Sequence, residues 1–123
     1  MKRFYSYRLG EYHGNVYHLT VSGEPSINDV EDFSVTVHYF DEEKEEEVEI
    51  ARIDTRHGGV HFDKLYRRDE PREFLDIEDY WEAEEMLREN WRTYAKSFSR
   101  REPHQRYSPL SRTVSRSSLA FSL

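Results

Sequence analysis

Hydrophobic and polar residues alternate along five stretches of the chain before Pro71, which is the pattern of β-strands with one buried face. The clearest stretch is residues 33–39, where Phe33, Val35, Val37 and Tyr39 alternate with Ser, Thr and His. The alternation places hydrophobic side chains on one face of a strand and polar side chains on the other. The five predicted strands are residues 4–9, 16–21, 33–39, 48–55 and 60–66.

Polar segments separate the predicted strands. Gly14-Asn15 predicts a tight turn between the first two, since both residues tolerate a positive φ. Residues 23–31 are polar and aperiodic and are expected to form a loop. Residues 41–49 are acidic at seven positions, so we expect a solvated turn followed by a charged strand entry.

After Pro71 the hydrophobic spacing changes to alternating steps of three and four, which predicts an amphipathic helix of about 20 residues. The stripe consists of Ile77, Tyr80, Glu84, Leu87, Trp91, Tyr94 and Phe98, widened by Trp81 and Ala95. Asp76 is the expected N-cap, with Asp79 three residues later. The helix must bury its stripe, and the sheet is the only partner available.

Together these elements predict an α+β fold, an antiparallel five-stranded meander with one long C-terminal helix packed on one face. Residues 1–100 are expected to form a single domain, which suits a chain of this length. Residues 101–123 contain six Ser residues and scattered Arg residues without any period. We therefore expect this segment to be a disordered tail.

Composition narrows the classes of function. The 123 residues include no Cys, which excludes disulfide scaffolds, cysteine zinc sites and thiol catalysis. No hydrophobic run approaches the ~20 residues of a membrane span, and no secretory signal is visible, so a cytoplasmic location without membrane contact is expected. The net charge of −7 argues against a chain that coats nucleic acid through bulk charge. Many carboxylates with only four Lys residues are typical of halophilic proteins.

Candidate chemistry concentrates in the hairpin predicted around Gly58-Gly59. A two-residue turn there pairs Asp54 with Asp63 and Arg56 with His61. The two carboxylates would then lie about 5 Å apart and repel each other, so neighbouring cationic groups should compensate for them. The face that they share also carries Arg52, Arg56, His61 and Arg67.

Three interpretations of this face are open. In the first, Arg and Asp side chains form a solvated salt-bridge ladder. In the second, His61 is a general acid or base oriented by Asp54 or Asp63, while Arg52 or Arg56 binds phosphate, which is the minimal set for metal-free RNA cleavage. In the third, His61, Asp54 and Asp63 bind a divalent metal ion.

Other His and Arg residues add less. Arg67 and Arg68 form a small basic spot that could contact an RNA backbone. His13, His18 and His38 each stand alone on or beside a predicted strand and are interpreted as surface residues. The Trp and Tyr stripe of the helix is interpreted as core and not as a platform for stacking bases.

The hairpin and the helix after it resemble the TumE-like toxins of prokaryotic toxin–antitoxin systems. The likeness rests on the run Arg52-x-Asp54, a short turn, His61 and a helix beginning soon after Phe74, and it covers roughly residues 30–98. It implies a small α+β domain, a ribonuclease-type toxin activity and a cognate antitoxin partner.

Two further features belong to this resemblance. The segment His61–Tyr66, with the sequence His-Phe-Asp-Lys-Leu-Tyr, is also similar to a related group of small haloarchaeal proteins. Where the toxin pattern usually has Asn and a second His, this chain has Thr55 and Asp63.

The leading hypothesis is a toxin-like domain that binds RNA and, if it is an enzyme, cleaves it without a cofactor. The candidate catalytic residues are His61, Asp54, Asp63 and Arg52, and the candidate substrate-binding residues are Arg56, Arg67 and Arg68. The expected partners are RNA and an antitoxin, and a homodimer is also considered. The alternatives are a non-enzymatic protein-interaction module and a divalent-metal-binding protein.

Overall fold

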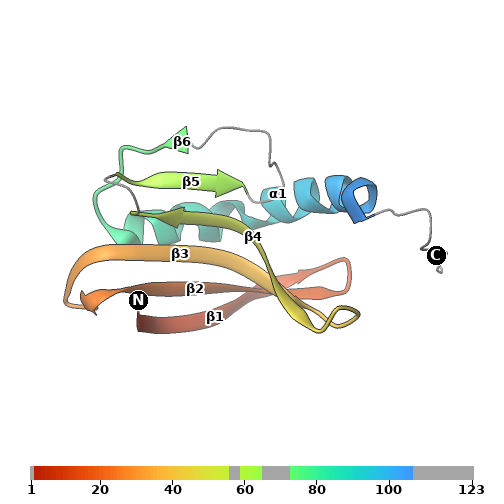
Figure 1. Ribbon diagram of the computed structural model, residues 1–123, viewed down its shortest axis with the longest axis horizontal. Helices are drawn as coiled ribbons and strands as arrows, with labels where there is room; N and C mark the ends of the chain where they lie inside the picture. Colours follow the sequence, from red (N-terminus) through yellow and green to blue (C-terminus); the bar gives the residue numbers. More distant parts are fainter. Residues whose placement is uncertain (1, 56–58, 65–72, 107–123) are drawn as a thin grey trace.

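The computed structural model describes residues 2–55, 59–64 and 73–106. It contains an antiparallel sheet with strand order β1-β2-β3-β4-β5-β6 and one C-terminal helix (Figure 1). The elements are β1 (Lys2–Tyr12), β2 (Asn15–Ser26), β3 (Asp29–Asp41), β4 (Glu46–Asp54), β5 (His61–Lys64), β6 (Glu73–Phe74) and α1 (Tyr80–Arg106). The predicted α+β fold, a meander followed by a helix packed on the sheet, is confirmed.

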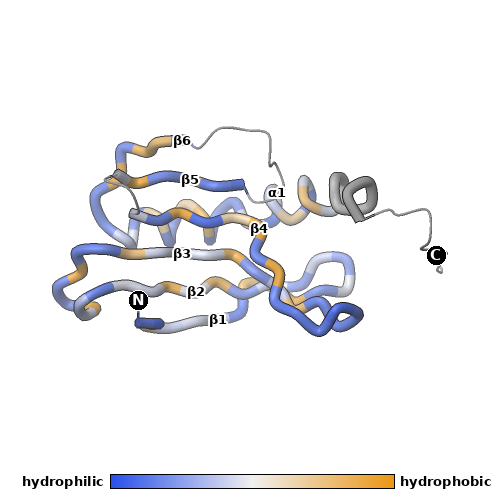
Figure 2. Tube along the Cα trace, in the orientation of Figure 1, coloured by the Kyte–Doolittle hydropathy of each residue, from blue (hydrophilic) through white to orange (hydrophobic). Residues whose placement is uncertain are grey.

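The core lies between α1 and the hydrophobic face of the sheet. From the helix it takes Ala83, Leu87, Trp91, Tyr94, Ala95 and Phe98, and from the central strands chiefly Tyr17, Leu19, Val21, Phe33, Val35, Val37, Tyr39 and Ile53. The Trp91 ring contacts Tyr17 with 5.3 Å between ring centroids. The turn between β3 and β4 is strongly hydrophilic, as the acidic run predicts (Figure 2). In the described part of the chain, no helix is long and apolar enough to cross a membrane.

The helix differs from the prediction at three points. Trp81 does not widen the buried stripe, because it lies about 100° around the helix from Tyr80 and is 55% exposed. The helix begins at Tyr80, so Asp79 and not Asp76 precedes it, and the Asp79 carbonyl accepts a hydrogen bond from the Glu82 N–H. Its end at Arg106 passes the boundary predicted at residue 100, because helix propagation needs no hydrophobic period. Residues 107–123 of the predicted tail lie outside the described residues.

The strands extend further than hydrophobic alternation suggested. The turn between β1 and β2 is His13-Gly14, one residue earlier than predicted, and both residues have a positive φ, 52° and 83°. Most of the predicted loop 23–31 belongs to β2 and β3, because backbone pairing continues after the alternation stops. A sixth, two-residue strand, Glu73–Phe74, pairs with β5.

An irregularity in the β3–β4 pair decides which side chains of β4 reach each face. Val37 pairs with Ala51 and His38 pairs with Glu49, which leaves Ile50 as an extra residue. Ile50 and Ala51 are therefore both buried although they are adjacent. Beyond this bulge the alternation of β4 is inverted, so Glu49 joins Arg52 on the polar face.

Two tyrosines connect the edge strand β1 to the helix. The hydroxyls of Tyr5 and Tyr7 each donate a hydrogen bond of 2.6 Å to the Glu84 carboxylate. Burial, followed by the hydrogen bond to Glu84, raises the pKa of both tyrosine hydroxyls above the usual value. The folded protein therefore favours the protonated hydroxyls.

We expect stability to fall at alkaline pH through these tyrosines. A pKa raised by folding stabilises the protein fully below the unfolded pKa of about 10, and this contribution is lost as the pH rises above that value. The double variant Tyr5→Phe/Tyr7→Phe should lose about 1 kcal/mol per hydroxyl at pH 7 and show a flatter decline above pH ~10. Urea denaturation at several pH values measures both effects, and an alkaline decline as steep as that of the wild type would contradict the prediction.

Candidate functional site

Polar side chains form rows across the sheet face opposite α1. One row is Arg3, Ser22, Ser34, Asp54 and His61, and the next is Ser6, Thr20, Thr36, Arg52 and Asp63. Short hydroxyl side chains occupy the middle of the sheet, and longer side chains lie around them. The result is a groove of about 490 Å³ lined by Arg3, Thr20, Ser22, Ser34, Thr36, His38, Glu47, Glu49 and Arg52.

The register of the β4–β5 hairpin differs from the prediction. Asp54 pairs with His61 and Arg52 with Asp63, so the predicted pairing of Asp54 with Asp63 is wrong by two residues. The connection is longer than a two-residue turn, because β4 ends at Asp54 and β5 begins at His61. A slip of two residues keeps every side chain on its face. The structure therefore still brings Arg52, Asp54, His61 and Asp63 together.

The three other candidate residues cannot be compared with the structure. Arg56, Arg67 and Arg68 lie outside the described residues. Their predicted contacts with substrate stay predictions.

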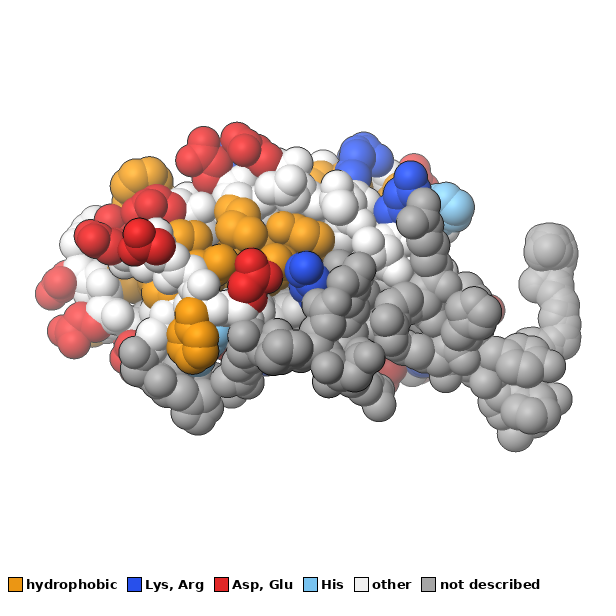
Figure 3. Space-filling view, turned by 90° about the horizontal axis from the view of Figure 1, so that it is seen from above, with side chains coloured by type: hydrophobic (Ala, Val, Ile, Leu, Met, Phe, Trp, Pro, Cys, Tyr) orange, Lys and Arg blue, Asp and Glu red, His pale blue; other side chains and the backbone are white. Residues whose placement is uncertain are grey.

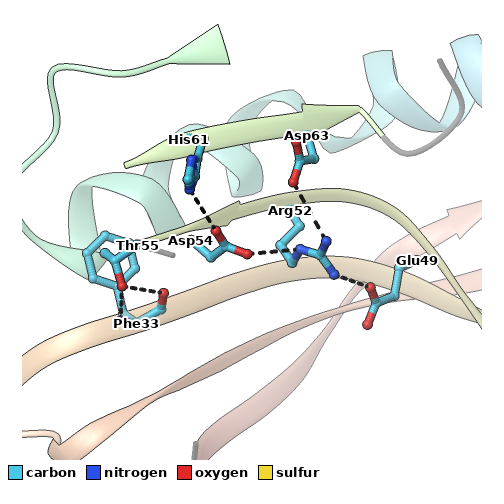
Figure 4. A network of polar contacts seen from close by, with 7 residues as sticks. All are labelled: Phe33, Glu49, Arg52, Asp54, Thr55, His61 and Asp63. Atoms are coloured by element: carbon cyan, nitrogen blue, oxygen red, sulfur yellow. Dashed lines mark hydrogen bonds and ion pairs between the residues drawn. The ribbon is translucent and has the colours of Figure 1, made fainter. Parts of the chain in front are cut away.

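Arg52 is the centre of a network of ion pairs (Figure 4). Its Nε lies 3.1 Å from Oδ2 of Asp54, its Nη1 3.0 Å from Oε1 of Glu49, and its Nη2 3.6 Å from Oδ2 of Asp63. The Nε2 of His61 lies 3.6 Å from the other carboxylate oxygen of Asp54. One guanidinium thus forms ion pairs with three carboxylates of this face.

Burial separates this network from a solvated salt-bridge ladder. His61 is 1% exposed and Asp54 is 3% exposed, while the Arg52 side chain is 22% exposed. The His61 ring contacts Phe74 of the neighbouring strand, with 5.4 Å between ring centroids. His61 is therefore buried and contacts Asp54, whereas Arg52 lines the groove.

Thr55, which follows β4 directly, connects the end of β4 to β3. Its hydroxyl accepts a hydrogen bond from the Phe33 N–H at 3.0 Å (Figure 4). The same hydroxyl lies within hydrogen-bond distance of a carboxylate oxygen of Asp32, at 3.2 Å. Thr55, which stands where the toxin pattern usually has Asn, thus connects the end of β4 to β3.

The described residues include no group of three or more His, Cys, Asp or Glu side chains arranged to hold a metal ion. Of the residues proposed for a divalent metal, Asp54 and Asp63 form ion pairs with the Arg52 guanidinium, and His61 contacts Asp54. Cationic charge at this position therefore comes from the chain itself.

A second polar chain lies in the groove, and the hydrophobic alternation does not predict it. The interpretation of His38 as a lone surface residue is corrected, because its Nε2 lies 2.6 Å from the Thr20 hydroxyl and its Nδ1 lies 2.6 Å from Oε1 of Glu47. Thr20 is also 2.9 Å from the Ser6 hydroxyl. The adjacent hydrophobic residues Ile50-Ala51 were the one available signal, because they mark the bulge that inverts the alternation of β4.

Comparison with known proteins identifies a family whose function is not known. The family model described as "Domain of unknown function (DUF7718)" matches residues 1–104. The chain belongs to this family. The match spans the whole sheet and nearly all of α1, so it includes both the Arg52 network and the groove. No match was found among curated proteins or among solved structures, and nothing in these comparisons links the chain to TumE-like toxins.

Proposed function

We propose that this protein is a cytoplasmic, toxin-class domain that binds RNA in the groove on the polar face of its sheet. The groove is the observation that carries the proposal. It combines the guanidinium groups of Arg3 and Arg52 with a floor of Ser and Thr hydroxyls. Guanidinium groups match the geometry of phosphate oxygens, and hydroxyls can hydrogen-bond to the 2′-hydroxyl and to unpaired base edges.

The charges around the groove define what kind of RNA binding to expect. Glu47 and Glu49 line the groove beside the two arginines, and Asp54 and Asp63 lie against Arg52, so the groove carries no excess positive charge. Affinity must then come from fixed hydrogen-bond donors and shape, and not from a broad positive field. With two phosphate contacts to a single strand, the plot of log affinity against log salt should have a slope of about −1.4.

Asp54, Asp63 and His61 have a positioning role in this proposal. Asp54 forms an ion pair with Nε of the guanidinium, and Asp63 forms one with Nη2. His61 contacts the carboxylate oxygen of Asp54 that does not face Arg52. A guanidinium fixed in this way loses little freedom when phosphate arrives. The acidic surface with few Lys residues also supports placing the protein in a halophilic, archaeal cytoplasm.

Arg3→Ala should weaken RNA binding about five- to tenfold, equal to about 1 kcal/mol. Arg3 is exposed on β1, so its removal should not disturb the fold. Fluorescence anisotropy with a labelled single-stranded RNA of roughly ten nucleotides measures the dissociation constant. Lys96→Ala, an exposed cation on α1, is the charge-matched control and should bind like the wild type.

Two outcomes would overturn the proposal. They are an absence of RNA binding by the wild type at low salt, and equal weakening by Arg3→Ala and Lys96→Ala. The toxin class is tested by inducing the wild type and Arg3→Ala in a host strain. Growth arrest that Arg3→Ala relieves supports the toxin class, and unaffected growth with both proteins contradicts it.

A protein-interaction module is the second candidate. A shallow groove of about 420 Å³ at the start of α1 is lined by the hydrophobic side chains of Ile77, Trp81 and Met86, together with Glu82, Glu85 and Glu89. On the face viewed in Figure 3, hydrophobic side chains similarly lie among acidic ones. This chemistry suits a basic segment with one hydrophobic anchor, and an antitoxin of that kind is the partner we would propose.

A further inference from the structure

Three polar side chains from three neighbouring strands form a continuous chain in the groove. Thr20 of β2, His38 of β3 and Glu47 of β4 are joined by two contacts of 2.6 Å at the two ring nitrogens of His38. They come together because Thr20 and His38 lie on the same face of adjacent strands, and the bulge at Ile50 brings Glu47 to that face. Hydroxyl, imidazole and carboxylate are thus arranged as in sites that move protons.

The hydrogen bonds decide which ring nitrogen of His38 carries the proton. An ionised Glu47 carboxylate can only accept, so Nδ1 of His38 donates to it. In the neutral ring Nε2 is then the acceptor, and it takes the hydrogen bond of the Thr20 hydroxyl. Nε2 therefore lies where a hydroxyl can give up a proton, which is the requirement for a general base.

Accessibility distinguishes His38 from His61. The His38 side chain is 17% exposed and lines the groove, whereas His61 is 1% exposed. The Thr20 hydroxyl marks the place where a substrate hydroxyl would donate to Nε2. Arg3 and Arg52 line the same groove, and two guanidiniums beside a base favour a phosphodiester over a carboxylic ester as substrate.

We propose that His38 is the general base of an RNA-cleaving site, with Glu47 as its positioning residue; this inference rests on the proposed RNA binding. Nε2 of His38 takes the proton of a ribose 2′-hydroxyl, and the 2′-oxygen forms a bond to the adjacent phosphorus. The bond from phosphorus to the 5′-oxygen breaks, and that oxygen takes a proton from water. The imidazolium returns its proton to the hydroxide left behind, so a 2′,3′-cyclic phosphate and a 5′-hydroxyl are formed without a metal ion.

His38→Gln should lower the rate of RNA cleavage about 100-fold or more while changing the dissociation constant for RNA less than threefold. The probe is a single-stranded RNA labelled at its 5′ end, and the products are identified as cyclic phosphates by mass spectrometry. A strand of the same sequence with 2′-deoxyribose at every position should stay intact, because it has no 2′-hydroxyl to attack the phosphorus. The matched control is His18→Gln, whose ring stacks on His38 with 5.9 Å between ring centroids, and it should cleave at the wild-type rate.

Two further variants separate the roles within the chain. Thr20→Val should bind RNA more weakly, because it removes one hydroxyl of the groove floor, but RNA that is bound should still be cleaved to the cyclic phosphate, because the substrate hydroxyl replaces the Thr20 hydroxyl at Nε2. Loss of cleavage at RNA concentrations that saturate the variant would identify Thr20 as a nucleophile and overturn the assignment. Glu47→Gln should lower the cleavage rate about tenfold. It should also change the ¹⁵N chemical shifts of the His38 ring toward the other tautomer, which a merely structural role of Glu47 would not do.

The outcomes distinguish this inference from the proposed function. RNA that the wild type binds but leaves intact, or cleavage by His38→Gln at the wild-type rate, overturns the inference and leaves RNA binding in place. If the wild type does not bind RNA at all, the proposed function fails and the inference fails with it. Cyclic phosphate products that depend on His38 and not on His18 support both.

Discussion

Arg52→Met should lower the free energy of unfolding by about 3 kcal/mol, because it leaves the buried carboxylate of Asp54 without its cation. Asp54 is 3% exposed, and its Oδ2 lies 3.1 Å from Nε of Arg52. The variant also removes the cation beside Asp63. Methionine retains much of the side-chain volume, so the measured loss reports charge and hydrogen bonding more than packing. Urea denaturation followed by circular dichroism provides the measurement.

Glu49→Gln is the matched control for this prediction. It removes a carboxylate from the same guanidinium, but the Glu49 side chain is 47% exposed. An exposed ion pair contributes about 0–1 kcal/mol, so this variant should stay close to the wild type. Equal effects of Arg52→Met and Glu49→Gln would show that burial does not determine the strength of the network.

Trp91→Ala should cost about 3–5 kcal/mol, the range for removing a large buried aromatic side chain. Trp91 is 6% exposed and contacts Tyr17 in the centre of the core. Its ring also lies against β1, where a Cβ added to Gly10 would come within 2.8 Å of its Cζ2 atom. Thermal and urea denaturation measure the loss.

Gly10 supplies a double-mutant cycle for the same contact. In the wild type Gly10→Ala should cost about 1–3 kcal/mol through overpacking, because the buried indole has little room to move. In the Trp91→Ala background the same substitution should be nearly neutral, since the clashing ring is gone. If Gly10→Ala costs the same in both backgrounds, the close approach of β1 to Trp91 is not what keeps position 10 a glycine.

The sequence predicts which face of the sheet the residues of the candidate site occupy, but it does not predict their cross-strand partners. Arg52, Asp54, His61 and Asp63 share one face in the prediction and in the structure, because an error of two residues in register does not move a side chain to the other face. The cross-strand partners were not predictable, because the pair Gly58-Gly59 suggests a two-residue turn and does not encode the longer connection. Burial of His61 likewise depends on what packs over it.

The sequence by itself determined the class and order of the elements. The alternation over residues 33–39 and the stripe Leu87, Trp91, Tyr94 and Phe98 depend only on spacing along the chain, and both faces are buried as predicted. The adjacent hydrophobic residues Ile50 and Ala51 mark where the alternation of β4 breaks, but only the tertiary structure decided that Glu47 thereby meets His38 and Thr20. Strand register is set by the packing of the whole core, so a local break in the pattern does not show which residues pair beyond it.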